Sequence, residues 1–146
     1  MSKCEVSAVD HIVMTVTDMS KTTDFYCSVL GTTMVEFVPP TGGPLRKSLH
    51  FGKQKINLHD AVSPYAPHAN TPQAGSVDLC FISAQSLDDW QAHLANHDVS
   101  VEKGPVRKSG ANGALISLYI RDPDGCLLYT SPSPRDMRRS RMPSSA

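Results

Sequence analysis

A strand of alternating character near the start of the chain has a second copy in its middle. Residues 9–16 alternate between an apolar face and a face that begins with His11. Residues 77–82 repeat this alternation, and matching the two apolar faces puts Asp78 at the position of His11. Both side chains are able to bind a metal, so the repeat predicts a metal site shared between the two copies.

Length and composition favour an ordinary globular domain. The chain has 146 residues, of which 40% are hydrophobic and 19% charged. It has no apolar run that could cross a bilayer and no signal-peptide core at its start, so we expect a cytoplasmic protein without a membrane partner. Its four cysteines contain no C-x-x-C pair, which favours reduced thiols over disulfides or structural zinc.

The first copy is expected to continue as a helix and three strands. Asp18 is suited to cap the helix, and Gly31 stands just past its end. The three strands are expected at residues 34–38, 47–51 and 54–59. Residues 60–75 are rich in proline, alanine and polar side chains, which suits a linker to the second copy.

The second copy repeats the order of the first. Ser86 opens a helix after the strand at 77–82. A strand at 101–103, a loop at 104–113, a strand at 114–121, a turn at 122–125 and one last strand should follow. The predicted fold class is α+β, with two tandem βαβββ modules packed into one domain around a cleft.

Six segments of the chain match one known family in the same order: residues 10–16, 25–31, 51–59, 75–82, 102–106 and 119–125. They resemble the vicinal-oxygen-chelate superfamily, which contains glyoxalases, bleomycin resistance proteins and dioxygenases. Within the superfamily, the chain is most similar to the group of glyoxalase domain-containing protein 5 and its bacterial relatives. The resemblance covers residues 8–125 and implies one glyoxalase-type domain over that range.

The resemblance also implies a divalent metal, Zn, Ni, Mn or Fe, held by the first and last strands of the two modules. His11 matches the first ligand position and Asp78 the third, where many relatives have His. The second position, often Glu in relatives, is Asn57 here, and His59 alternates onto the same face and is able to reach the cleft instead. The predicted metal ligands are His11, His59 and Asp78. The usual final Glu is replaced by Tyr129.

The implied chemistry is of the lyase or isomerase type. A metal with open positions binds two adjacent oxygens of a small substrate, for which a glutathione conjugate is one option, and stabilises an enediolate after proton removal. Because neither Glu position is kept, the chain has no evident base. Two alternatives are a metal-free, ligand-sequestering protein of the bleomycin-resistance type, and an extradiol dioxygenase or thiol transferase. The expected partner is a small-molecule substrate, and a homodimer stays open.

The end of the chain resembles a translated sequencing adapter. With suitable synonymous codons, residues 126–136 correspond to a transposase-type sequencing-library adapter, and residues 140–146 to its outer primer. We therefore predict that residues 126–146 are an adapter-derived, disordered tail and that the natural last strand is missing. Residues 126–130 are nevertheless strand-compatible and can pair with a neighbour until Pro132 and Pro134 end the ladder.

The tail also explains the basic character of the C-terminus. It contains four arginines and one acid, which taken alone would suggest a nucleic-acid-binding arm. Without the tail the remaining chain has a negative formal charge. We therefore expect no nucleic-acid partner.

Overall fold

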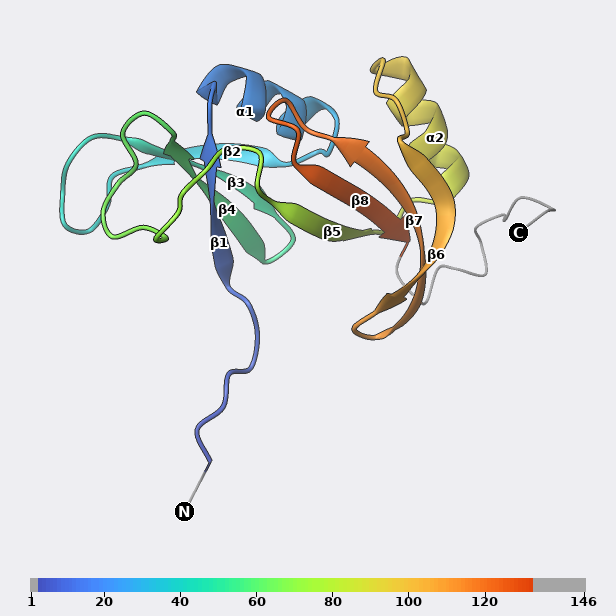
Figure 1. The fold of residues 1–146 in the computed structure, drawn as a ribbon, viewed down its shortest axis with the longest axis horizontal. Helices are drawn as coiled ribbons and strands as arrows, with labels where there is room; N and C mark the ends of the chain where they lie inside the picture. Colours follow the sequence, from blue (N-terminus) through green and yellow to red (C-terminus); the bar gives the residue numbers. More distant parts are fainter. Residues whose placement is uncertain (1–2, 133–146) are drawn as a thin grey trace. The chain divides into compact units, whose positions relative to one another are not determined.

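The computed structural model describes residues 3–132, and these form two compact units that divide between Ala74 and Gly75. Each unit contains one four-stranded sheet and one helix (Figure 1). The predicted α+β class and the tandem βαβββ repeat are confirmed. No helix among residues 3–132 is long and apolar enough to span a membrane.

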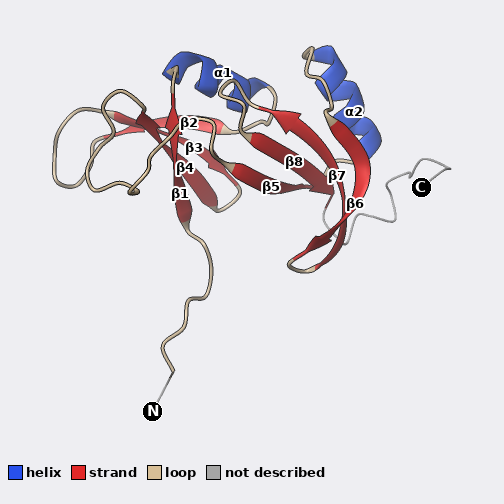
Figure 2. Ribbon diagram, in the orientation of Figure 1, coloured by secondary structure: helices blue, strands red, loops and turns tan. Residues whose placement is uncertain are grey.

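The first unit is a mixed sheet with a single parallel pair. Its elements are β1 (His11–Val16), α1 (Met19–Ser28), β2 (Thr33–Phe37), β3 (Arg46–Phe51) and β4 (Gln54–Asp60). The strand order is β1-β4-β3-β2, with β1 parallel to β4 and the other neighbours antiparallel (Figure 2). Because parallel neighbours need a long crossover, the whole remainder of the unit lies between them in sequence.

Local signals position α1 as the sequence predicts. The Asp18 side chain accepts a hydrogen bond from the backbone N–H of Lys21, which caps the first turn. Gly31 adopts a φ of 72°, a left-handed conformation that costs glycine little and lets the chain leave the helix. The chain turns back there, and the N–H of Thr32 donates to the carbonyl of Tyr26.

The core of the first unit lies on the helix side of the sheet. Met14, Leu49, Ile56 and Leu58 are fully buried there, and Tyr26 of α1 donates a hydrogen bond to the sulfur of Met14 at 3.5 Å. Each such aliphatic side chain stabilises the fold by about 1.5–3 kcal/mol when removed from water. Since side chains alternate along a strand, the neighbours of these residues occupy the opposite face, called here the polar face of the first sheet.

The second unit has the same topology. Its elements are β5 (Asp78–Ser83), α2 (Leu87–Asn96), β6 (Lys103–Gly110), β7 (Gly113–Arg121) and β8 (Leu127–Pro132), in the sheet order β5-β8-β7-β6. Ser86 caps α2 by accepting from the N–H of Asp89. Leu87 and Leu94 of α2 are buried, and Trp90 donates to the hydroxyl of Ser83 at 2.9 Å.

The predicted loop at residues 104–113 and the short strand at 101–103 are wrong. Lys103–Gly110 forms β6, which pairs antiparallel with β7 and turns through residues 111–112. The glycines and lysines of β6 give no clear apolar alternation, so periodicity did not indicate a strand. Backbone pairing with the strongly apolar β7 does not require that alternation.

The last strand completes the second sheet. β8 lies between β5 and β7, parallel to the first and antiparallel to the second, and ends at Pro132. Disorder therefore does not begin at Cys126, because the strand-compatible residues after it complete the ladder through their backbone. The remainder of the predicted tail, residues 133–146, lies outside the described residues.

Two glycines with nearly equal φ values provide a test of this packing. Gly104 and Gly113 have φ values of 122° and 123°. A Cβ at Gly104 would collide with the carbonyl oxygen of Ser117 and lie 3.2 Å from the Cα of Leu118, whereas a Cβ at Gly113 would meet nothing. Gly104→Ala should therefore cost about 1–3 kcal/mol more than Gly113→Ala, as overpacking against a fixed backbone does.

Urea denaturation followed by circular dichroism measures both free energies of unfolding. Gly113→Ala is the matched control, since it carries the conformational strain without the collision. Equal losses in the two variants would contradict the close approach of β6 to β7.

Candidate functional site

The strand register decides which polar residues share a face of the first sheet. In the β1–β4 pair, His11 lies beside Lys55, Val13 beside Asn57 and Thr15 beside His59. Cross-strand partners point to the same face. His11, Asn57 and His59 therefore all lie on the polar face, as the alternation in the sequence predicts.

His11 begins β1 with its ring exposed. Its Nδ1 lies 2.8 Å from Oδ2 of the neighbouring Asp10. When Nδ1–H donates to that carboxylate, Nε2 carries the free lone pair. This is the arrangement in which a carboxylate orients a histidine for metal binding.

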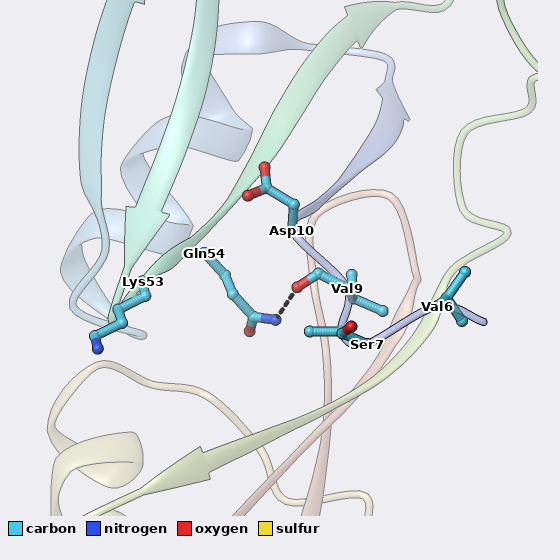
Figure 3. A pocket seen from close by; sticks show the side chains of 7 residues that line it. Val6, Ser7, Val9, Asp10, Lys53 and Gln54 are labelled. Carbon is cyan, nitrogen blue, oxygen red and sulfur yellow. Dashed lines mark hydrogen bonds between the residues drawn. The ribbon is translucent and has the colours of Figure 1, made fainter. Parts of the chain in front are cut away.

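The segment before His11 is held by the end of the β3–β4 hairpin. The side-chain amide of Gln54 donates to the carbonyl of Val9 at 2.9 Å (Figure 3). An open pocket of about 760 Å³ lies here, lined by residues 6–10 with Lys53 and Gln54. The bond fixes the position at which the chain enters β1, and so the position of His11.

His59 lies on the same face but not beside His11. The register sets the two residues four positions apart on adjacent strands, about 13 Å at about 3.3 Å per residue. His59 is only 5% exposed, and its ring meets the Tyr65 ring edge-on with centroids 5.4 Å apart. Its buried Nδ1 has no hydrogen-bond partner.

Asn57 stands two positions nearer to His11 than His59 does, and its buried Oδ1 also has no partner.

The electrostatic surroundings keep His59 neutral. Burial lowers the pKa of the His59 imidazole, and the positive charge of Arg46 and the nearby His68 ring lower that pKa further. The neutral ring has one nitrogen that donates and one that accepts.

Asp78 lies at the edge of a smaller pocket in the second unit. The pocket has a volume of about 290 Å³ and is lined by Asp78, Glu102, Lys103, Lys108, Tyr119, Leu127 and Tyr129. The carboxylate of Glu102 is engaged by the guanidinium of Arg121, which donates two hydrogen bonds of 3.1 and 3.0 Å. Asp78 is exposed and opens β5, as His11 opens β1.

Tyr129 occupies in its sheet the position that Asn57 occupies in the first. It lies beside Cys80 in the parallel β5–β8 pair, as Asn57 lies beside Val13. Its ring stacks on Tyr119 with centroids 4.6 Å apart. Burial raises the pKa of the Tyr129 phenol, and the neighbouring Cys80, Asp78 and Tyr119 raise it further. The phenol is therefore protonated at neutral pH and cannot act as a carboxylate would.

Comparison with known proteins places the chain in a family. The pattern described as "Glyoxalase/Bleomycin resistance protein/Dioxygenase superfamily" matches residues 8–129. The chain belongs to this superfamily.

Superfamily members with similar sequences come from fungi and bacteria. Glyoxalase domain-containing protein RDO1 of Mycosarcoma maydis is 47% identical over 126 residues, covering 86% of this chain and 68% of the relative. Virulence protein STM3117 of Salmonella typhimurium is 43% identical over 126 residues, which cover 86% of this chain and 84% of the relative. An integron cassette protein of V. cholerae has a similar structure, with a TM-score of 0.84 and 42% identity. The match covers 90% of this chain and 99% of the cassette protein.

More distant structures of the same fold have different functions in their names. A lactoylglutathione lyase of Agrobacterium tumefaciens is 25% identical with a TM-score of 0.63, covering 88% of this chain and 95% of its own. TnmS3, an antibiotic binding protein of a Streptomyces species, is 20% identical with a TM-score of 0.67. The match covers 89% of this chain and 98% of TnmS3. The latter likeness concerns the fold alone. Superfamily membership therefore does not by itself choose between catalysis and binding.

The residues of this superfamily member fit a metal only in part. His11 with Asp10 has the donor arrangement that a metal requires, and Asp78 offers an exposed carboxylate. Tyr129 does not fit, because its phenol stays protonated. Within residues 3–132, no three His, Cys, Asp or Glu side chains come close enough together to hold a metal ion. The ligand set of His11, His59 and Asp78 stays a prediction.

Two residues at His59 were not anticipated from the sequence. Arg46 opens β3 and places its guanidinium 3.9 Å from the centroid of the Tyr65 ring. The alternation of β3 could have placed Arg46 on the polar face, together with Ser48. Nothing in the sequence indicates Tyr65, because it lies in the irregular segment after β4.

The lowered pKa of His59 predicts a pH dependence of stability. As pH falls through the ordinary histidine pKa of 6.5, the unfolded chain takes up a proton that the folded chain still refuses. The stability associated with neutral His59 is present above that pH and is lost as pH falls toward the lower folded pKa. In metal-free buffer, the free energy of unfolding should therefore decline less between pH 7 and pH 5 in His59→Gln than in the parent chain.

Urea denaturation at several pH values in this range measures the slope. Gln91→Asn, an uncharged change at an exposed position of α2, is the control and should keep the parent slope. If the free energy of unfolding of His59→Gln changed with pH as steeply as that of the parent chain, His59 would not be the group responsible for the pH dependence.

Proposed function

We propose that this chain is a glyoxalase-like, metal-dependent protein with lyase or isomerase chemistry on a small substrate that binds through two adjacent oxygens. The observation that carries the proposal is the Asp10–His11 pair at the first position of β1 in a member of this superfamily. The named activity of the Agrobacterium relative supports the reaction class.

The proposed roles differ from residue to residue. His11 would bind a divalent ion, Zn, Ni, Mn or Fe, through Nε2, with Asp10 holding the ring in the required tautomer. Asp78 would supply a carboxylate, and His59 or Asn57 the remaining protein ligand. The metal would polarise the substrate oxygens as a Lewis acid. Because neither Asn57 nor a protonated Tyr129 is a base at neutral pH, we expect weak or no proton abstraction in this chain.

A metal-free binding function is the second candidate. The stacked Tyr119 and Tyr129 rings, with the ammonium of Lys108 5.4 Å from the Tyr119 centroid, border the pocket of the second unit. Aromatic faces of this kind bind flat apolar ligands. Retention of such a ligand by protein dialysed free of metal would favour sequestration. Oxygen uptake with catechols, or glutathione transfer to an epoxide, would identify the dioxygenase or thiol transferase alternatives.

His11→Ala tests the metal proposal. Loss of a ligand should weaken Zn²⁺ or Ni²⁺ binding by more than the roughly 10–100-fold that loss of an outer-shell partner causes, and Asp10→Asn should fall within that smaller range. Isothermal titration calorimetry on the chain with Tyr129→Glu measures both. Equal affinity in His11→Ala and its parent would contradict the assignment of His11.

The assay needs a background free of a competing histidine pair. His93 of α2 and His97, which caps the C-terminal end of that helix, have ring centroids 4.5 Å apart, and histidines spaced four residues apart chelate divalent ions. The titrations are therefore made in a His97→Gln background. In that background, His59→Ala and Asn57→Ala are compared to identify the remaining ligand. Only removal of the residue that binds the metal should weaken metal binding tenfold or more.

Tyr129→Glu should strengthen metal binding. A glutamate restores the ionised carboxylate that relatives have at this position, and a neutral phenol cannot replace that charge. Tyr129→Gln is the matched control, because it has nearly the shape of glutamate without the charge. Tight stoichiometric binding in the parent chain, unimproved by Tyr129→Glu, would show that the proposed ligand set is wrong.

A further inference from the structure

Basic and aromatic side chains gather around His59, at the end of the polar face away from His11. Arg46 lies beside His59, because the antiparallel register places Lys47 opposite Leu58 and Arg46 one step further along. Tyr65 and His68 come from the segment that follows β4. We call Arg46, Asn57, His59 and Tyr65 the Arg46 cluster. All four belong to the first unit.

Tyr65 fixes the positions of the two nitrogen-rich side chains. The Arg46 guanidinium carbon lies 3.9 Å from its ring centroid, and the His59 ring meets it edge-on at 5.4 Å. The Tyr65 hydroxyl donates to the carbonyl of Leu45 at 3.5 Å, which ties the ring to the start of β3. A guanidinium packed on an aromatic ring keeps its N–H edge available for other hydrogen bonds.

Three polar atoms of the cluster are buried without a partner. They are Nε of Arg46, Nδ1 of His59 and Oδ1 of Asn57. Native proteins pair nearly all such atoms, and each exception requires an explanation. The arginine nitrogen is a donor, and the histidine nitrogen is a donor in one of its two tautomers. Rotation of the Asn57 amide by 180° exchanges its oxygen for an NH₂ donor.

The charge around these atoms is positive. In the described part of the chain, no carboxylate forms an ion pair with Arg46, and the ion pairs formed are His11–Asp10 and Arg121–Glu102. Arg46 and His68 both act on the His59 imidazole as positive neighbours. A guanidinium beside His59 favours an anion at this position, and it argues against His59 as the remaining ligand of a metal cation.

We propose that the Arg46 cluster is a binding subsite for a small oxyanion, a carboxylate or phosphate group carried by a small molecule. Arg46 donates from its planar fork, which matches two oxygens of such a group. His59 and the rotated Asn57 amide donate to the same group, and Tyr65 holds Arg46 and His59 in place. The subsite goes beyond the proposed metal-dependent function, since it needs no metal.

The test uses the full chain in a buffer of constant ionic strength that contains a metal chelator. Inorganic phosphate and acetate are titrated separately, and the NMR resonances of the His59 ring and the Arg46 Nε–H are followed. Both resonances should shift saturably with at least one of the two anions. The anion that saturates at the lower concentration identifies the group as phosphate or carboxylate.

Arg46→Gln and Lys47→Gln form a matched pair of variants. They remove the same charge from adjacent residues of β3, whose side chains point to opposite faces of the sheet. Arg46→Gln should weaken anion binding at least tenfold, and Lys47→Gln less than twofold. Arg46→Lys keeps the charge but loses the fork, and an intermediate loss is expected in that milder variant even where Arg46→Gln fails to fold.

Three outcomes would overturn the proposal. In the first, neither anion shifts the His59 ring saturably, as expected if water alone fills the cluster. In the second, Lys47→Gln weakens binding as much as Arg46→Gln, as expected of general electrostatic attraction. In the third, Arg46→Lys binds as the parent does. Because metal is absent throughout, failure of the metal proposal leaves each outcome interpretable.

Discussion

In each unit the first strand pairs in parallel with the last, β1 with β4 and β5 with β8. A parallel pair cannot be closed by a tight turn, so a helix and two strands must lie between the partners. The helix then covers one face of the sheet and takes up its apolar side chains. The candidate functional groups of each unit lie on the opposite face of its sheet.

The parallel register also divides the polar face of the first sheet into two chemically different parts. At the start of β1, the Asp10 carboxylate lies within hydrogen-bond distance of the His11 ring, an arrangement that suits a cation. Four positions further along the pair, Arg46 and Tyr65 surround His59 and make its position favourable for an anion. An unpaired buried polar atom costs about 1–3 kcal/mol, so the unmatched donors at this end are unfavourable until a ligand or water meets them.

In the second unit, the last strand separates the fold from the proposed chemistry. β8 completes the sheet through its backbone, which any strand-compatible side chain permits. The side chains of β8 decide its chemistry separately, because the phenol of Tyr129 stacks on Tyr119 and keeps its proton at neutral pH. A strand can thus complete this fold through its backbone while its side chains offer no carboxylate at the position that the metal proposal needs.

The sequence by itself determined the repeat, the α+β class, the cap of each helix and the face on which His11, Asn57 and His59 lie. These follow from local patterns, since a period of two assigns a side chain to a face and a capping residue acts within one turn. It missed β6, whose glycines and lysines hide the strand. Only the tertiary structure decided that His59 lies far from His11 and beside Arg46 and Tyr65, because the offset between two strands and the course of an irregular segment depend on long-range pairing and packing that no local pattern records.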